Sequence, residues 1–279
     1  MLNKSGLIVL EGLDGSGKST QFERLSAYFS ENDIKHKAIS FPDYDNPSSA
    51  LVKMYLNGEI GKTPADVNAY AASSFYAVDR YACYKQFWEH DYKEGSLVLA
   101  ARYVTSNCIY QMTKLPKEQW EDFIGWLEDY EYDKLGLPRP DKVIFLDMPI
   151  EISQKLMSGR YGGDESKKDI HEANVEYLKK CREAALFTAE KQDWDIIPCS
   201  DGSEPYTKDK ILLSVRNSYN HNLNIQKGNY ETTKTDKNYH GYGLLNVKKS
   251  VKKYNGYINI EPNEEFVVNI SMNYEKKEE

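Results

Sequence analysis

The sequence predicts an α/β domain in which a parallel five-stranded sheet is flanked by helices, followed by a small α+β appendage. The first observation is that apolar runs of strand length alternate with stretches of 3.6-residue apolar spacing. The second is a glycine-rich pattern, G-x-x-x-x-G-K-S, directly behind the first apolar run. The third is a change to polar composition at about residue 219. Strands that alternate with helices are typical of parallel sheets covered on both faces.

Five apolar runs are expected to form the strands: 6–10, 37–40, 96–100, 143–146 and 195–197. One helix is expected from residue 20 onward, and others at 47–57, 64–92, 117–130, 150–158, 170–190 and 204–217. Prolines stand near four of these helix starts, where proline is tolerated. In open parallel sheets ligands bind beyond the carboxyl ends of the strands. We therefore expect the segments that follow the strands to share one crevice.

Residues 12–19 form a complete phosphate loop between a predicted strand and a predicted helix. Its glycines let backbone N–H groups face a phosphate chain, and the helix N-terminus adds a positive dipole end. Lys18 is placed to reach the outer phosphates and Ser19 to ligate Mg²⁺. The alternative is a glycine-rich turn that only starts a helix. The residues expected to bind the nucleotide are Gly12, Gly15, Ser16, Gly17, Lys18, Ser19 and Thr20.

Composition narrows the function classes. The chain has 279 residues, 40% of them hydrophobic, which is enough for one large core and an appendage. No apolar run approaches the length of a membrane span, and the first strand begins too early for a signal peptide, so we expect a cytoplasmic protein. Four scattered cysteines indicate neither a zinc site nor a disulfide framework. A net charge of -7 argues against binding to DNA or RNA.

Two arginines are candidates for holding a second phosphate group. If the acceptor of the γ-phosphoryl group is itself a phosphate, it needs no strong base but does need cations beside it. Arg80 lies in a predicted helix and Arg102 follows the third predicted strand. Arg80 has an alternative interpretation as a solvent-facing ion pair with Asp79 or a neighbouring acid.

Five segments in order resemble thymidylate kinase over about residues 5–215. They are Gly12–Thr20, Phe41–Pro42, Phe75–Arg80, Arg102–Gln111 and Arg139–Asp147. The resemblance implies a P-loop nucleoside-monophosphate-kinase fold, usually homodimeric. It also implies phosphoryl transfer from MgATP to dTMP, with dTDP and ADP as products.

The resemblance also implies roles for individual residues. Arg80 and Arg102 would grip the dTMP phosphate, and Asp14 would contact the sugar or a metal-bound water. Tyr76 would stack on thymine, although a core aromatic is the rival interpretation. The full set implied for dTMP is Asp14, Phe41, Pro42, Tyr76, Arg80, Arg102, Asn107, Tyr110 and Gln111. Within it, Asn107 and Gln111 would read the base edge, Tyr110 would lie under the deoxyribose, and Phe41-Pro42 would form a wall or an ordinary turn.

Some members of this family carry an arginine inside the phosphate loop, and this loop has none. The transition-state cation must then come from elsewhere. The glycine-hinged segment 158–168 suits a lid over ATP, with Arg160 as the first candidate and Lys167 and Lys168 as weaker ones. A solvated loop is the alternative. The catalytic set predicted in this way is Lys18, Arg102, Arg160 and Asp14.

One position departs from the family pattern. The family usually places an acid directly before the Arg-Tyr pair, and this chain has Ala101. That carboxylate tends to support the metal-water shell, so Mg²⁺ affinity or turnover is expected to fall unless Asp14 or Asp147 compensates. Asp147 has the alternative interpretation of a helix cap.

The tail is expected to be a separate module, with a boundary that divides the chain into residues 1–218 and 219–279. A helix is expected at 244–254 and a hairpin from strands 257–260 and 266–270. Residues 234–272 resemble the last glycine box and closing hairpin of the ATPase domain of sensor histidine kinases. The helix and the Asp-x-Gly box that complete such a pocket are missing, so we interpret the tail as a remnant or docking element.

Two alternative functions remain open. A deoxynucleoside kinase would need a general base after the second strand, for which Asp43 is the only weak candidate. A nucleotide-binding regulatory module would bind both substrates with weak or no turnover, and Ala101 would then mark the loss.

Overall fold

The computed structural model describes residues 6–160, 175–205, 210–218, 224–226, 229–231, 257–262 and 265–273. The chain divides into two compact units, Met1–Pro205 and Tyr206–Glu279, and each is described by itself. The boundary predicted after residue 218 falls inside the second unit and stays a prediction for the functional module.

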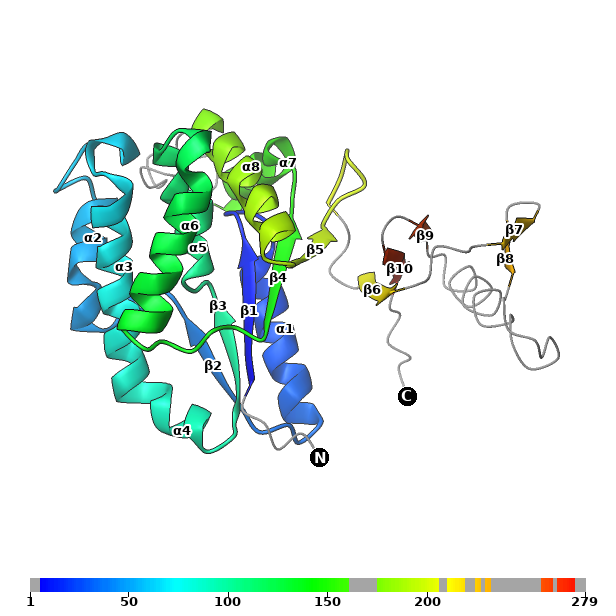
Figure 1. Cartoon of the computed structure of the whole chain (residues 1–279), viewed down its shortest axis with the longest axis horizontal. Coiled ribbons are helices and arrows are strands. Elements are labelled where there is room, and N and C mark those ends of the chain that lie inside the picture. The colour runs from blue at the N-terminus through cyan, green and yellow to red at the C-terminus, as the bar shows by residue number, and fades with distance from the viewer. Residues whose placement is uncertain are drawn as a thin grey trace. The chain divides into compact units, whose positions relative to one another are not determined.

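A five-stranded sheet forms the centre of the first unit (Figure 1). Its strands are β1 (Gly6–Gly12), β2 (His36–Ser40), β3 (Leu97–Ala101), β4 (Lys142–Asp147) and β5 (Asp195–Pro198). The order is β2-β3-β1-β4-β5, and all neighbouring strands are parallel. The predicted fold class is confirmed, because all five strand segments pair as expected.

Helices cover both faces of this sheet; in Figure 1, α2, α3 and α6 lie on one side of the strands and α1 on the other. The α-helices are α1 (Lys18–Glu31), α2 (Ala50–Leu56), α3 (Ala69–Cys83), α4 (Glu89–Lys93), α5 (Thr105–Tyr110), α6 (Trp120–Glu128), α7 (Ile150–Arg160) and α8 (Val175–Lys191). Short 3₁₀ segments are η1 (Pro47–Ser49), η2 (Pro64–Asp66), η4 (Met112–Lys114) and η5 (Lys117–Gln119), and π-helical segments are η3 (Tyr84–Trp88) and η6 (Asp129–Lys134). The helix predicted at 64–92 is thus four helical segments, η2, α3, η3 and α4, and α5 was not predicted.

Burial on both faces explains why the strands read as continuous apolar runs. Val9 and Leu10 are neighbours on β1, so their side chains point to opposite faces of the sheet, and they are 0% and 3% exposed. Phe145 of β4 is fully buried as well. The helix α3 begins where the Asn68 side chain accepts a hydrogen bond from the Ala71 backbone N–H at 2.9 Å. Such a cap stabilises a helix by about 1 kcal/mol. The start of α3 matters because this helix carries one wall of the cavity described below.

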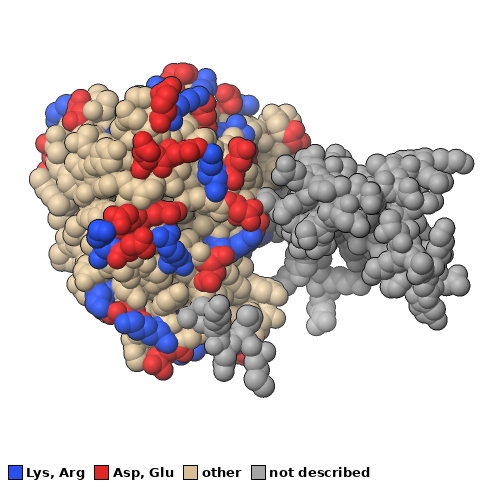
Figure 2. All heavy atoms as spheres, in the orientation of Figure 1, with Lys and Arg blue, Asp and Glu red and all other residues tan. Residues whose placement is uncertain are grey.

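The surface of the first unit mixes both signs of charge, and Figure 2 shows basic and acidic side chains interspersed on the face in view. Exposed ion pairs such as Lys134–Asp129 at 2.8 Å are part of this mixture. Within the described residues, no helix is both long and apolar enough to cross a membrane.

The second unit contains β strands where one helix was predicted. The segment predicted as a helix at 204–217 includes β6 (Lys210–Ser218), so that prediction is wrong. β6 pairs antiparallel with β10 (Glu265–Asn273), which also pairs with β9 (Tyr257–Pro262). The predicted hairpin is therefore confirmed, and its pairing with β6 is the long-range contact that overrides local helical spacing. A further pair joins β7 (Asn224–Gln226) and β8 (Asn229–Glu231), and the helix predicted at 244–254 lies outside the described residues.

Candidate functional site

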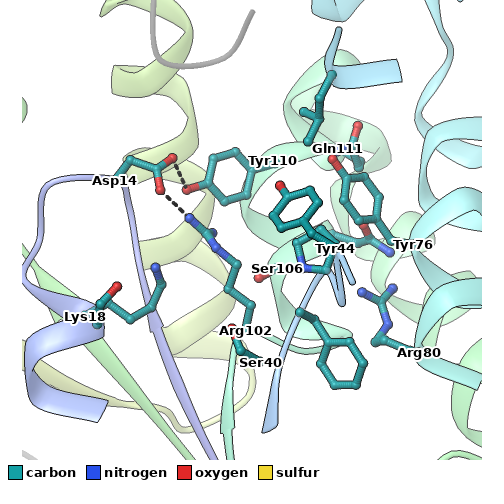
Figure 3. A pocket seen from close by; sticks show the side chains of 15 residues that line it. Asp14, Lys18, Ser40, Tyr44, Tyr76, Arg80, Arg102, Ser106, Tyr110 and Gln111 are labelled. Carbon is teal, nitrogen blue, oxygen red and sulfur yellow. Dashed lines mark hydrogen bonds and ion pairs between the residues drawn. The ribbon is translucent and has the colours of Figure 1, made fainter. Parts of the chain in front are cut away.

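A cavity of about 300 Å³ opens where β1, β2 and β3 end (Figure 3). It is lined by all nine residues predicted for dTMP, together with Lys18 and Ser19 of the phosphate loop. Four further lining residues were not predicted: Ser40, Tyr44, Leu56 and Ser106. The carboxyl ends of parallel strands thus bring together segments that are about 100 residues apart in the chain.

The phosphate loop has the geometry that its glycines predict. Gly15 and Gly17 have φ values of 78° and 85°, in the left-handed region that favours glycine. A Cβ atom on Gly15 would lie 2.6 Å from the Ser153 carbonyl oxygen, so α7 packs too closely for any side chain. Among the described residues, the buried hydroxyl of Ser16 has no hydrogen-bond partner. A buried polar atom in a loop that opens a helix is suited to an anionic ligand.

Arg102, Asp14 and Tyr110 form a connected group beside the phosphate loop (Figure 3). The Arg102 guanidinium forms an ion pair with Asp14 and lies 5.0 Å from the centre of the Tyr110 ring. The Tyr110 hydroxyl donates to the second Asp14 carboxylate oxygen at 3.3 Å. Arg102 itself has φ = 65°, and its backbone N–H donates to the Leu10 carbonyl at 3.0 Å. This backbone turn after β3 directs the guanidinium toward the loop that follows β1. Burial raises the pKa of Tyr110 well above its ordinary value, so the phenol stays protonated as a donor.

Arg80 is held in a different way, by a buried carboxylate that the sequence did not single out. Its Nε and Nη2 donate to the two carboxylate oxygens of Glu131 at 2.7 and 2.6 Å, and Nη1 donates to the Tyr103 carbonyl at 3.3 Å. Arg80 is 1% exposed and Glu131 is fully buried. The alternative interpretation of Arg80 as a solvent-facing ion pair is therefore wrong. Glu131 thus balances the charge of Arg80, and the predicted contact of Arg80 with the dTMP phosphate stays a prediction.

Asp79, the residue before Arg80, anchors the opposite wall of the cavity. It accepts hydrogen bonds from the Asp43 backbone N–H at 2.9 Å and from the Ser48 hydroxyl at 2.6 Å. Burial raises its pKa, while these hydrogen bonds oppose the shift. The Phe41 side chain is 4% exposed, and the Phe41–Pro42 peptide bond is cis. Phe41 and Pro42 both line the cavity, whereas Asp43 is not among the lining residues.

Two amide side chains complete the end of the cavity that contains Arg80. The Asn107 amide group donates to Glu131 at 3.1 Å and to the Ser73 carbonyl at 3.4 Å. Gln111 is 1% exposed, and its carbonyl oxygen has no partner among the described residues. Figure 3 shows Arg80, Tyr76 and Gln111 on one side of Arg102, and Lys18 and Asp14 on the other. The cavity therefore has a cationic end at the phosphate loop and a hydrogen-bonding end at α3 and α5.

A second carboxylate missed by sequence reasoning supports the Arg102 segment from below. Glu11, at the end of β1, is fully buried and accepts hydrogen bonds from the Thr105 hydroxyl at 2.6 Å, the Ser106 hydroxyl at 2.9 Å and the Tyr103 backbone N–H at 3.2 Å. An acidic residue at the end of an otherwise apolar run was the available signal. Glu131 gave none, because its partner lies 51 residues away in the chain.

The residues proposed to hold Mg²⁺ are compatible with it but do not form a cage by themselves. The Asp14 carboxylate and the Ser19 hydroxyl both line the cavity and are the hard oxygen donors that Mg²⁺ prefers. Among the described residues, no group of three or more acidic, His or Cys side chains is arranged to hold a metal. Asp147 ends β4, three residues before α7 begins at Ile150, so it is not at the N-cap position of that helix. Its carboxylate is bound by the Arg182 guanidinium at 2.6 and 2.7 Å and does not line the cavity, so it does not replace the missing acid at Ala101 there.

The predicted lid lies mostly outside the described residues. Arg160 is the last residue of α7, and nothing is described of its side chain; Lys167 and Lys168 fall in the segment that is not described. The Arg160 role therefore stays a prediction.

Comparisons with known proteins bear on both units. Residues 10–211 match the thymidylate kinase family, and residues 204–273 match the GHKL domain family. A thymidylate kinase of Mycobacterium tuberculosis is 30% identical over 176 residues, which cover 62% of this chain and 81% of that protein. A probable thymidylate kinase of Thermococcus onnurineus is 31% identical and covers 66% of this chain and 84% of its own length. A solved thymidylate kinase from Candida albicans has a TM-score of 0.52 at 25% identity, and the match covers 71% of this chain and 85% of that structure.

Proposed function

The chain belongs to the thymidylate kinase family, and we propose that its cavity transfers the γ-phosphoryl group of ATP to dTMP. The products are ADP and dTDP, the precursor of dTTP. The observation that supports this most strongly is the two-ended cavity, in which a phosphate loop faces a buried hydrogen-bonding end across Arg102. That layout fits a nucleoside monophosphate whose phosphate meets the phosphate chain of a second nucleotide.

The phosphate loop is the proposed site of ATP. Backbone N–H groups of the segment 12–19 and the Lys18 ammonium hold the phosphates, and Ser19 ligates Mg²⁺. When bound, Mg²⁺ neutralises charge on the phosphate oxygens. Asp14, whose carboxylate lines the cavity beside Lys18, is proposed to hold a water of that ion. Thr20 extends the same loop and completes the set proposed for ATP.

The dTMP phosphate is proposed to lie against Arg102. A phosphate oxygen of dTMP attacks the γ-phosphorus, a new P–O bond forms, and the bond between the γ-phosphorus and the bridging oxygen of ADP breaks. No general base is needed, because the attacking oxygen is already anionic. Arg102 and Lys18 offset repulsion between the two phosphate groups, and Arg160 is the proposed cation for the transferred group.

The base is proposed to occupy the end of the cavity formed by α3 and α5. Tyr76 supplies a ring to stack on thymine, and Tyr110 lies toward Asp14, where the deoxyribose is expected. The Gln111 carbonyl oxygen has no partner among the described residues and is an acceptor at this end of the cavity. Arg80 retains two N–H groups beyond the three bonded to Glu131 and Tyr103, and these are donors for a base carbonyl.

We propose a homodimer that forms through α2, α3 and η3. Large apolar side chains are exposed on these elements, with Val78 at 48%, Tyr81 at 40% and Phe87 at 48%. Single exposed apolar residues are ordinary, but a group of them on adjoining elements indicates an interface. Light scattering of the wild type and of Val78→Glu/Tyr81→Glu tests this, and an unchanged mass for the two proteins would contradict it. Cytoplasmic location, and the lack of a nucleic-acid or membrane partner, stay predictions.

The C-terminal unit is proposed to be a remnant or docking element with no second ATP site. Its match to the GHKL family spans 70 residues, 204–273, and the sequence lacks the segments that hold magnesium and adenine in a complete pocket. The two family matches follow each other along the chain and overlap only at residues 204–211, which is consistent with a fusion of two modules.

A coupled assay of ADP release tests the main proposal. Wild-type protein with MgATP is compared across dTMP, dUMP, dCMP, AMP and thymidine as acceptors. Turnover mainly with dTMP is the expected result. Turnover mainly with thymidine would favour a deoxynucleoside kinase, a result at odds with the position of Asp43 outside the cavity. No turnover with any acceptor, although dTMP raises the melting temperature, would favour a binding module.

A further inference from the structure

A buried carboxylate beside the base end of the cavity has no access to a ligand, yet it contacts two residues that line the cavity. Glu131 is fully buried, does not line the cavity, and lies in the π-helical segment η6 that continues α6. Its two oxygens accept from Arg80 at 2.7 and 2.6 Å, and one of them also accepts from the Asn107 amide at 3.1 Å. Arg80 and Asn107 both line the cavity.

Both oxygens of Glu131 accept hydrogen bonds, and this fixes the orientation of the Arg80 and Asn107 side chains. A carboxylate can only accept hydrogen bonds when ionised, so the Asn107 amide must turn its NH₂ group toward Glu131. The second amide hydrogen is bound to the Ser73 carbonyl at 3.4 Å. Both amide hydrogens are then used, and Asn107 offers a ligand only its oxygen. Arg80, fixed along one edge, offers only N–H donors.

We propose that Glu131 is a positioning residue that sets the donor and acceptor polarity of the base-reading end. Through it, Arg80 presents donors while Asn107 presents an acceptor. Thymine carries a carbonyl at C4 and an N–H at N3, which this pattern complements. Cytosine carries an amino group and a bare nitrogen at the same positions, so it meets a donor with a donor and an acceptor with an acceptor. This inference rests on the proposed function, since it assumes a pyrimidine in this end.

The test compares the wild type with Glu131→Gln and with Glu128→Gln as a matched control. Glu128 is on the preceding helical turn and pairs with Arg139 at 3.2 Å, outside the cavity. A glutamine at 131 offers an NH₂ group as well as an oxygen, so the Asn107 amide is free to turn over. We expect the KM for dTMP to rise at least about tenfold, and the ratio of kcat/KM for dTMP over dCMP to fall at least about tenfold. The KM for ATP should stay within about twofold, and Glu128→Gln should leave all three values unchanged.

A second variant guards against loss of the fold, because removal of one partner leaves a buried charge uncompensated. The double variant Arg80→Met/Glu131→Leu removes both charges together, and it should keep a melting temperature near that of the wild type. It should nevertheless lose the same discrimination between dTMP and dCMP. The positioning role is wrong if Glu131→Gln lowers only the melting temperature and leaves the KM for dTMP and the dTMP-to-dCMP ratio of kcat/KM unchanged. It is also wrong if the folded double variant still discriminates between dTMP and dCMP.

The same proteins separate this inference from the proposed function. Absence of dTMP turnover by the wild type would contradict the kinase activity. Calorimetric Kd values for dTMP and dCMP then decide the role of Glu131 by themselves: a fall in their ratio for Glu131→Gln supports it, and an unchanged ratio overturns it.

Discussion

The two arginines of the cavity are both paired with carboxylates, but in opposite surroundings. The Arg102 and Asp14 side chains are 17% and 23% exposed, whereas those of Arg80 and Glu131 are 2% and 0% exposed. A partly solvated pair exchanges partners at low cost, because water compensates each charge while it moves. A buried pair does not, because separation leaves a charge without solvent. The phosphate end can therefore rearrange around arriving phosphates, while the base end is fixed before any ligand binds.

The largest effect should come from removing the cation of the phosphate loop. Lys18→Met keeps most of the side-chain volume but removes the positive charge that stabilises the γ-phosphoryl group during its transfer. We expect kcat to fall by about 10³, with a smaller change in the KM for dTMP. Steady-state kinetics measure both values. If only the KM for dTMP changed, Lys18 would act at the base end of the cavity, and the two ends would not differ as proposed.

A smaller effect should follow from Arg102→Lys, which keeps the charge and removes the planar fork. A lysine cannot hold Asp14 and a phosphate at the same time with fixed geometry. We expect kcat/KM for dTMP to fall by about 10- to 100-fold, with little change in melting temperature, because the native pair is partly exposed. Equal destabilisation by Arg102→Lys and Arg80→Lys in thermal melts would show that the two ends do not differ in rigidity.

A third effect is the contribution of Lys114 to the pH dependence of the free energy of unfolding. Lys114 donates to the Tyr55 hydroxyl and the Val67 carbonyl, both at 2.9 Å, and burial lowers its pKa from 10.5 to about 8. Between pH 8 and 10.5 the unfolded chain thus binds a proton that the folded chain has released, so this residue's contribution to stability rises with pH. We expect the free energy of unfolding of the wild type, relative to Lys114→Met, to increase across that window.

Chemical denaturation at several pH values measures this difference, and Lys134→Met is the control. The pKa of Lys134 is raised by its hydrogen bond to Asp129, so its contribution is kept up to about pH 10.5 and lost above it. A flat difference for Lys114→Met between pH 8 and 10.5 would show that Lys114 keeps its proton in the folded protein.

The smallest effect is expected from removal of the C-terminal unit. Every residue named in the cavity precedes Pro205, the last residue of the first unit. Chains that end at residue 218 and at residue 205 should both keep kcat/KM for dTMP within about twofold of the full chain. Activity in the first and loss in the second would support a kinase module that extends to residue 218. Loss in both would show that neither end of the cavity is independent of the tail.

Much of this site was predictable because its residues follow strand ends within short, patterned segments. The phosphate loop, Phe41–Pro42 and Arg102 each come directly after a strand, so the topology of a parallel sheet brings them together. Glu131 was not predictable in this way. It belongs to a π-helical turn, and its pairing with Arg80 depends on how α6 packs beside α3, which no local pattern encodes.

The difference between local patterns and long-range packing also explains why the helix predicted at 204–217 was wrong. Its apolar spacing is compatible with a helix, and only pairing with residues 265–273, about 50 positions later, makes Lys210–Ser218 a strand. Local periodicity predicts an element well when the element's partners are also local or when one face is simply buried. It fails where a distant strand supplies the hydrogen bonds.

The positive φ of Arg102 lowers the stability of the folded protein. Its φ of 65° is a conformation that costs a non-glycine residue about 1 kcal/mol or more, and a glycine there would relieve that cost. Glycine would also remove the side chain that joins the two ends of the cavity. A selection for turnover should therefore reject Arg102→Gly even though it relieves the backbone strain, so this position couples backbone strain to catalysis.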